Sequence, residues 1–127
     1  MAEFAQFRAL ENTDEAFRLD NTTGNQKTFN FDLPSLDPAR TVIIMFKVAM
    51  SGAAQLQMII NQNPGPSINF TLDPPPGLHQ PRSWHEIIGS NGGLKASSNI
   101  LRVLNNNPSA SVVTVSDVVF LYHAKTV

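Results

Sequence analysis

Short segments in which apolar and polar residues alternate with a period of two recur along most of the chain. In one of them, Phe29, Phe31 and Leu33 alternate with Asn30 and Asp32, as expected of a β-strand that buries one face. Turn-forming Pro, Gly and Asn residues separate these segments, and sustained helical periodicity is hard to find. Further alternating segments occur at 56–60, 68–72, 82–88 and 99–104.

The most apolar segment, residues 41–50, is rich in β-branched side chains. We expect it to form a central strand that is covered on both faces. Residues 112–115 and 118–122 are predicted to form two closing strands, separated by Ser116 and Asp117. About nine strands at this spacing favour an all-β fold, a sandwich or a barrel. The predicted core comprises Val42, Ile44, Phe46 and Val48, with Leu101, Val103, Val118, Phe120 and Tyr122 nearby.

Composition narrows the class of protein. The chain has 127 residues, of which 42% are hydrophobic and 15% are charged. These values fit one folded domain over 1–127, with acidic strands and loops at 1–37 and the main β-strand core at 41–123. The formal net charge is -1, which argues against nucleic-acid binding because that function needs a basic face. The chain contains no cysteine, so disulfides and thiolate chemistry are excluded.

The N-terminal sequence MAEF has neither the basic segment nor the following apolar run of a signal peptide. Lys47 interrupts the longest apolar run, which is also too short to span a bilayer. We therefore expect no membrane insertion. The protein would be cytoplasmic or would leave the cell by a non-classical route.

Charge is distributed unevenly along the chain. Residues 1–37 carry seven acidic and three basic side chains, whereas the remaining residues carry three acidic and six basic ones. This asymmetry fits either a solvated acidic edge or head-to-tail contact between subunits. We expect a closed homo-oligomer, a dimer or a trimer, in which several weak sites bind together.

Motifs for catalysis and for metal binding are missing. The sequence has no nucleophile elbow and no phosphate-binding glycine loop followed by lysine. His79, His85 and His123 lack the spacing at which two side chains share a metal ion. Oxygen donors at 20–25 leave calcium as an alternative, although the acidic density of a calcium loop is absent. We therefore expect no enzyme activity and no cofactor.

The segment 79–86 gathers side chains that suit sugar recognition. An aromatic ring packs against sugar C–H groups, and charged or amide groups hydrogen-bond hydroxyls. Strand alternation places Arg82, Trp84 and Glu86 on one face and His85 on the other. The alternative is that Trp84, the only tryptophan, belongs to the core and that its neighbours are solvated. The candidate ligand-binding residues here are His79, Arg82, Trp84, His85 and Glu86.

Two asparagine-rich loops would complete such a site. Residues 61–63 and 105–107 each precede a proline, and Asn63 or Asn106 would close the polar rim. Asparagine also favours tight turns, because it tolerates positive φ and hydrogen-bonds its own backbone. A purely structural role for both loops is therefore the alternative.

Several segments resemble a known family. The sequences SWHEI at 83–87, LKA at 94–96, NILRV at 99–103 and SDVVFLY at 116–122 are similar to the jelly-roll sugar-binding domains of glycoside hydrolases and related galactose-binding-like modules. This resemblance covers residues 41–123, the main jelly-roll core, and implies an antiparallel β-sandwich of jelly-roll type with structural roles for Asn99 and Asp117. It also implies a lectin-like, non-catalytic protein that binds a glycan or glycoconjugate. The alternative is a structural or assembly β-sandwich that binds no sugar.

Overall fold

The computed structural model describes residues 3–10, 15–61, 68–72, 82–88 and 93–125. These residues form nine strands: β1 (Glu3–Ala9), β2 (Phe17–Leu19), β3 (Gln26–Phe31), β4 (Val42–Gly52), β5 (Leu56–Ile60), β6 (Ile68–Leu72), β7 (Arg82–Ile88), β8 (Asn99–Asn105) and β9 (Ser111–Lys125). They include no helix long and apolar enough to cross a membrane.

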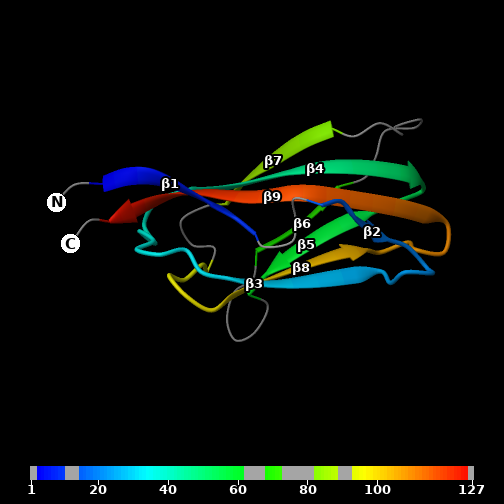
Figure 1. The fold of residues 1–127 in the computed structure, drawn as a ribbon, viewed down its shortest axis with the longest axis horizontal. Coiled ribbons are helices and arrows are strands. Elements are labelled where there is room, and N and C mark those ends of the chain that lie inside the picture. The colour runs from blue at the N-terminus through cyan, green and yellow to red at the C-terminus, as the bar shows by residue number, and fades with distance from the viewer. Residues whose placement is uncertain (1–2, 11–14, 62–67, 73–81, 89–92, 126–127) are drawn as a thin grey trace.

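The strands make two antiparallel sheets that lie one above the other (Figure 1). The five-stranded sheet has the order β1-β9-β4-β7, with β2 also paired to β9. The four-stranded sheet has the order β3-β8-β5-β6. This arrangement confirms the predicted antiparallel β-sandwich.

The last strand, β9, holds the five-stranded sheet together, because it pairs with β1, β2 and β4. Its register against β4 shifts between Met45 and Lys47, and Asp117 has a φ of 52°. Both features mark a β-bulge, which inserts one extra residue into a strand. The prediction of two closing strands is wrong, since β9 continues through Ser116 and Asp117 as one strand of 15 residues.

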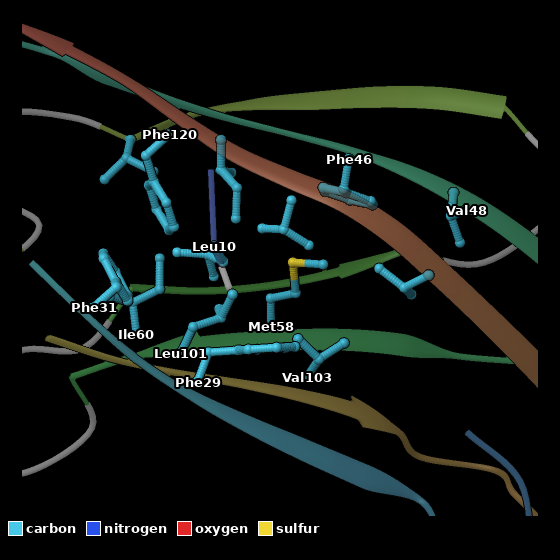
Figure 2. Close-up of a cluster of buried hydrophobic side chains, with 14 of the residues drawn as sticks. Leu10, Phe29, Phe31, Phe46, Val48, Met58, Ile60, Leu101, Val103 and Phe120 are labelled. Atoms are coloured by element: carbon cyan, nitrogen blue, oxygen red, sulfur yellow. The ribbon is translucent and has the colours of Figure 1, made fainter. Parts of the chain in front are cut away.

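The core lies between the sheets and is built from alternate side chains of the facing strands (Figure 2). Every residue of the predicted core is buried, which confirms that prediction. Phe31 of β3 and Phe120 of β9 stack across the core with ring centroids 4.5 Å apart. The buried Tyr122 hydroxyl donates a hydrogen bond to the Pro34 carbonyl oxygen at 3.0 Å, so its polar atom is satisfied.

β4 is central in its sheet, but only one of its faces is covered. Ile44, Phe46 and Val48 are buried, whereas Met45 is 40% exposed and the Lys47 side chain 57% exposed. The prediction that both faces are covered is wrong, because an antiparallel sandwich leaves the outer face of each sheet open to solvent. The outer face of this sheet therefore carries exposed apolar side chains.

The core packing predicts a large effect of truncating Phe46. Phe46→Ala should lower the free energy of unfolding by about 3–5 kcal/mol, because it loses transfer energy and leaves a cavity. Met45→Ala, one residue away on the outer face, is the matched control and should cost less than about 1 kcal/mol. Urea unfolding measures both. Similar losses would contradict the assignment of the inner and outer faces of β4.

The end of β4 comes close to the chain just before β9, and this approach requires a glycine. Gly52 has a φ of +71°, and a Cβ atom there would lie 2.3 Å from the Ala110 carbonyl oxygen. Gly52→Ala should therefore destabilise the protein by roughly 2–4 kcal/mol. Gly24→Ala is the control, since Gly24 also has positive φ but has no atom within 4 Å of the added carbon. A thermal midpoint of Gly52→Ala equal to that of the wild-type protein would mean that the contact at Gly52 contributes nothing.

Candidate functional site

The predicted sugar-binding segment includes β7, the strand that pairs with β4 at the margin of the five-stranded sheet. In this register Trp84 lies opposite Phe46, and Glu86 lies opposite Ile44. Trp84 is 39% exposed, and its indole Nε1 donates a hydrogen bond to Glu86 Oε1 at 3.0 Å. Arg82 is exposed on the same face of the strand. The structure thus brings together Arg82, Trp84 and Glu86.

The other predicted site residues do not join this group. His85 lies on the opposite face of β7. The Asn106 side-chain amide donates to Gln57 Oε1 at 2.7 Å, and this contact lies on the other sheet. His79 and Asn63 fall outside the described residues. A glycan site at 79–86 therefore stays a prediction.

Asn61 and Asn99 support the end of the four-stranded sheet. Asn61 has a φ of 52°, a conformation that asparagine tolerates, and its amide donates to Asn99 Oδ1 at 2.8 Å. Asn99 is fully buried and exchanges hydrogen bonds of 2.9 and 2.7 Å with the Lys95 backbone. Asp117 forms the bulge of β9 and an ion pair with Lys47 at 3.3 Å. These contacts agree with the structural roles that the resemblance implies for Asn99 and Asp117.

A hollow of about 410 Å³ involves all four strands of the path β1-β9-β4-β7. We call it the apolar hollow, because Phe7, Met45, Trp84 and Leu121 contribute to it. Phe7 is 70% exposed and Leu121 is 36% exposed, so aromatic and aliphatic surface meets solvent here. Such surface packs equally well against a sugar ring or against another apolar protein surface.

A second hollow of about 410 Å³ is lined mainly by polar residues, and we call it the polar hollow. In the described part of the chain, the Arg8 guanidinium and the Asn30 amide have no hydrogen-bond or ion-pair partner. Asp32 Oδ1 accepts a hydrogen bond from the Ser98 backbone N–H at 2.9 Å, while Oδ2 accepts none from any described residue. The lining consists of Arg8, Leu10, Asn30, Phe31, Asp32, Ser98 and Ile100.

Sequence reasoning missed the polar hollow, because its residues are far apart along the chain. Pairing of β3 with β8 places Asn30 opposite Ile100, and Arg8 comes from β1 of the other sheet. Burial raises the pKa of the Tyr122 hydroxyl, and the charge of Arg8 opposes this rise. The one signal in the sequence was the alternation at 29–33, which put Asn30 and Asp32 on the exposed face of their strand.

A third hollow, of about 500 Å³, lies beside Asp20. Asp20 Oδ1 accepts hydrogen bonds from the Thr23 N–H at 2.7 Å, the Thr23 hydroxyl at 2.8 Å and the Thr22 N–H at 2.9 Å. Oδ2 accepts from Arg18 Nε at 2.5 Å. The Thr23 donors, followed by Arg18, hold the pKa of the Asp20 carboxyl well below its usual range. A carboxyl kept ionised in this way stabilises its turn and is unsuited to acid–base catalysis near neutral pH.

A metal site needs several ligating side chains grouped at one place. Within the described ranges, no three His, Cys, Asp or Glu side chains are grouped so that they could hold a metal ion. The loop at 20–25, the calcium alternative, uses the Asp20 oxygens to accept hydrogen bonds from its own turn. Calcium binding there stays a prediction.

Comparison with known proteins gives a likeness of fold. No protein-family model and no curated protein matches the sequence. The structure of dimeric latent PorU from Porphyromonas gingivalis matches with a TM-score of 0.65 and 10% identity, over 98% of this chain and 13% of that chain. A family 29 carbohydrate-binding module matches with a TM-score of 0.59 and 8% identity, over 94% and 86% of the two chains.

A third structure is the family 11 carbohydrate-binding module from Clostridium thermocellum in complex with a β-1,3-1,4-mixed-linked tetrasaccharide. It matches with a TM-score of 0.53 and 9% identity, over 94% of this chain and 84% of that chain. The chain therefore has the jelly-roll β-sandwich fold of carbohydrate-binding modules, which confirms the fold that the resemblance implies. This chain spans only a small part of PorU but most of the length of both modules.

The hydrogen bonds of Asp20 predict a dependence of stability on pH. The folded-state pKa lies below the ordinary value of 3.8, so the unfolded chain takes up the proton first as pH falls. The stabilisation by Asp20 is therefore fully present above pH 3.8 and is lost progressively as pH falls from that value through the lower folded-state pKa. Thr23→Val removes the hydroxyl donor and should raise the folded-state pKa, measured by NMR titration of the Asp20 carboxyl carbon. An unchanged titration would mean that the hydroxyl does not act on Asp20.

Proposed function

We propose that the protein is a non-catalytic carbohydrate-binding protein that holds a glycan in the polar hollow. The observation that carries the proposal is a set of hydrogen-bonding groups there that have no partner among the described residues. They are the Arg8 guanidinium, the Asn30 amide and Asp32 Oδ2, beside the exposed apolar residue Ile100. The likeness of fold to carbohydrate-binding modules supports it. The volume of about 410 Å³ falls within the range of ligand pockets.

The chemistry of the polar hollow matches that of sugar hydroxyls, each of which both donates and accepts a hydrogen bond. The Arg8 guanidinium only donates, the open Asp32 oxygen only accepts, and the Asn30 amide does both. Ile100 is 42% exposed and offers apolar surface to the C–H groups of a sugar ring. One cation and one carboxylate leave the hollow without net charge, which suits a neutral glycan.

The strand β7 is the second candidate for glycan contact. The half-exposed Trp84 would pack against a sugar face, while Arg82 and Glu86 would hydrogen-bond its hydroxyls. This arrangement is supported by the common face that the three residues share. It is separate from the polar hollow, so variants at the two places distinguish them.

We propose binding without catalysis and without a cofactor. Asp20 lies beside a hollow and has a strongly shifted pKa, but the shift is downward and is caused by the turn that Asp20 stabilises. Calcium dependence is part of the test, through titrations in calcium chloride and in a chelator. Equal affinity in both would support the absence of a metal cofactor.

A structural or assembly module without sugar binding is the second candidate function. The apolar hollow favours it, because Phe7 is 70% exposed there. Ile87 of the same sheet, outside the hollow, is 67% exposed. Contiguous exposed apolar surface often marks a protein interface. The two functions are compatible, since self-association would place several weak glycan sites on one particle and increase avidity.

The glycan proposal predicts a strong effect of Arg8. A glycan-array screen would first identify the best ligand, and calorimetric titration would then measure its affinity. Arg8→Ala should weaken binding at least about tenfold, because a hydrogen bond to a charged group contributes about 1.5–3 kcal/mol. Asn30→Ala should weaken it less, since both partners are neutral.

Arg82→Ala is the matched control, because it removes an exposed arginine from β7 and leaves the polar hollow intact. Loss of affinity in Arg82→Ala and Trp84→Phe, with Arg8→Ala unchanged, would move the glycan to β7. No binding to any arrayed glycan by the wild-type protein would overturn the carbohydrate-binding function itself.

A further inference from the structure

β7 is an unusually open strand. Within the described part of the chain it pairs only with β4, and Figure 1 places it at the margin of its sheet. Five of its seven residues are exposed, and only Ile88 is buried. An edge strand with exposed faces on both sides presents backbone N–H and C=O groups to any strand that can pair with them.

The charged side chains of β7 are also available. Arg82 has no ion-pair or hydrogen-bond partner among the described residues. From the described residues Glu86 accepts one hydrogen bond, from Trp84 Nε1 to Oε1, and Oε2 accepts none. One cation and one carboxylate thus stand on the same face of the strand, two residues before and two residues after Trp84.

We infer that β7 pairs antiparallel with β7 of a second copy of this chain, in a register centred on Trp84. The two-fold axis then sets Trp84 opposite its equivalent, and Arg82 of each copy opposite Glu86 of the other. Directly opposed side chains in an antiparallel pair are close enough to form ion pairs. This inference rests on the self-association proposed above and names the surface that produces it.

Charge complementarity selects both the partner and the register. A register centred on His85 would oppose Arg82 to Ile88 of the other copy and leave both charges unpaired. The Trp84 register instead forms two ion pairs related by symmetry, as a closed dimer interface requires. The segment Arg-x-Trp-x-Glu is self-complementary in charge when two copies run antiparallel, so a second copy fits this edge.

The pairing keeps the contacts already present in one subunit. Glu86 can accept from Arg82 of the other copy through Oε2 while Oε1 still accepts from its own Trp84. The contact is only one strand wide and is smaller than a stable dimer interface. We therefore expect reversible association, with a dissociation constant on the order of 10–100 µM.

The test is sedimentation equilibrium up to about 500 µM, with a set of charge variants. Arg82→Glu and Glu86→Arg should each weaken self-association at least about tenfold, because like charges then face each other across the axis. The double variant R82E/E86R restores opposite charges and should associate within about threefold of wild type. An equimolar mixture of the two single variants should form heterodimers, because all its opposed pairs are attractive.

Lys95→Glu is the control for net charge, because it changes the total charge as Arg82→Glu does, at an exposed residue outside β7. It should leave association unchanged, and thermal unfolding confirms that every variant is folded.

A wild-type protein that stays monomeric at the highest concentration would overturn both self-association and this pairing. Association that Arg82→Glu does not weaken, or that the double variant does not restore, would overturn the pairing alone. A dimer that responds to the charge swap supports the pairing even where no glycan binds, so this inference and the glycan function fail separately.

Discussion

The five-stranded sheet depends on the bulge at Asp117 in β9. Before the bulge the buried residues include Val113 and Val115, and after it they include Val118 and Phe120. A strict period of two would turn Phe120 outward, away from its stacking partner in the other sheet. The extra residue restores the inward direction of the apolar side chains after the bulge. One strand can therefore pair with β2 along its first half and with β1 along its second half, while both halves face the same core.

The sequence shows that the alternation of apolar residues is interrupted at 116–117, but it does not show whether the interruption is a turn or a bulge. The polar pair at 116–117 between two apolar runs is equally typical of a turn, and only the continuous pairing of β9 with β4 identifies a bulge. The alternation itself predicted the core residues and most strands correctly, because burial on one face imposes it. It misjudged the outer face of β4, since the apolar Ile43 and Met45 resemble residues of a strand covered on both sides.

The candidate sites differ in how far a sequence can reveal them. Arg82, Trp84 and Glu86 lie within five residues, so strand periodicity alone placed them on one face, as the register of β7 bears out. Periodicity could not show that this strand stands at the sheet margin and leaves Trp84 half exposed. The polar hollow needs Arg8 from one sheet beside Asn30 from the other, and that proximity depends on long-range packing that leaves no local pattern.

The two proposed surfaces lie at opposite ends of one strand order. The polar hollow includes Arg8 from β1, whereas β7 ends the path on the other side of β9 and β4. Pairing through β7 would therefore leave the polar hollow of each copy uncovered, with the two copies of β1 about 34 Å apart at roughly 4.8 Å per strand spacing. A short oligosaccharide cannot bridge that span, so the second site adds affinity only on a surface that displays many glycans. Weak, reversible pairing suits such a role, because a surface that concentrates the protein also drives the pairing by mass action.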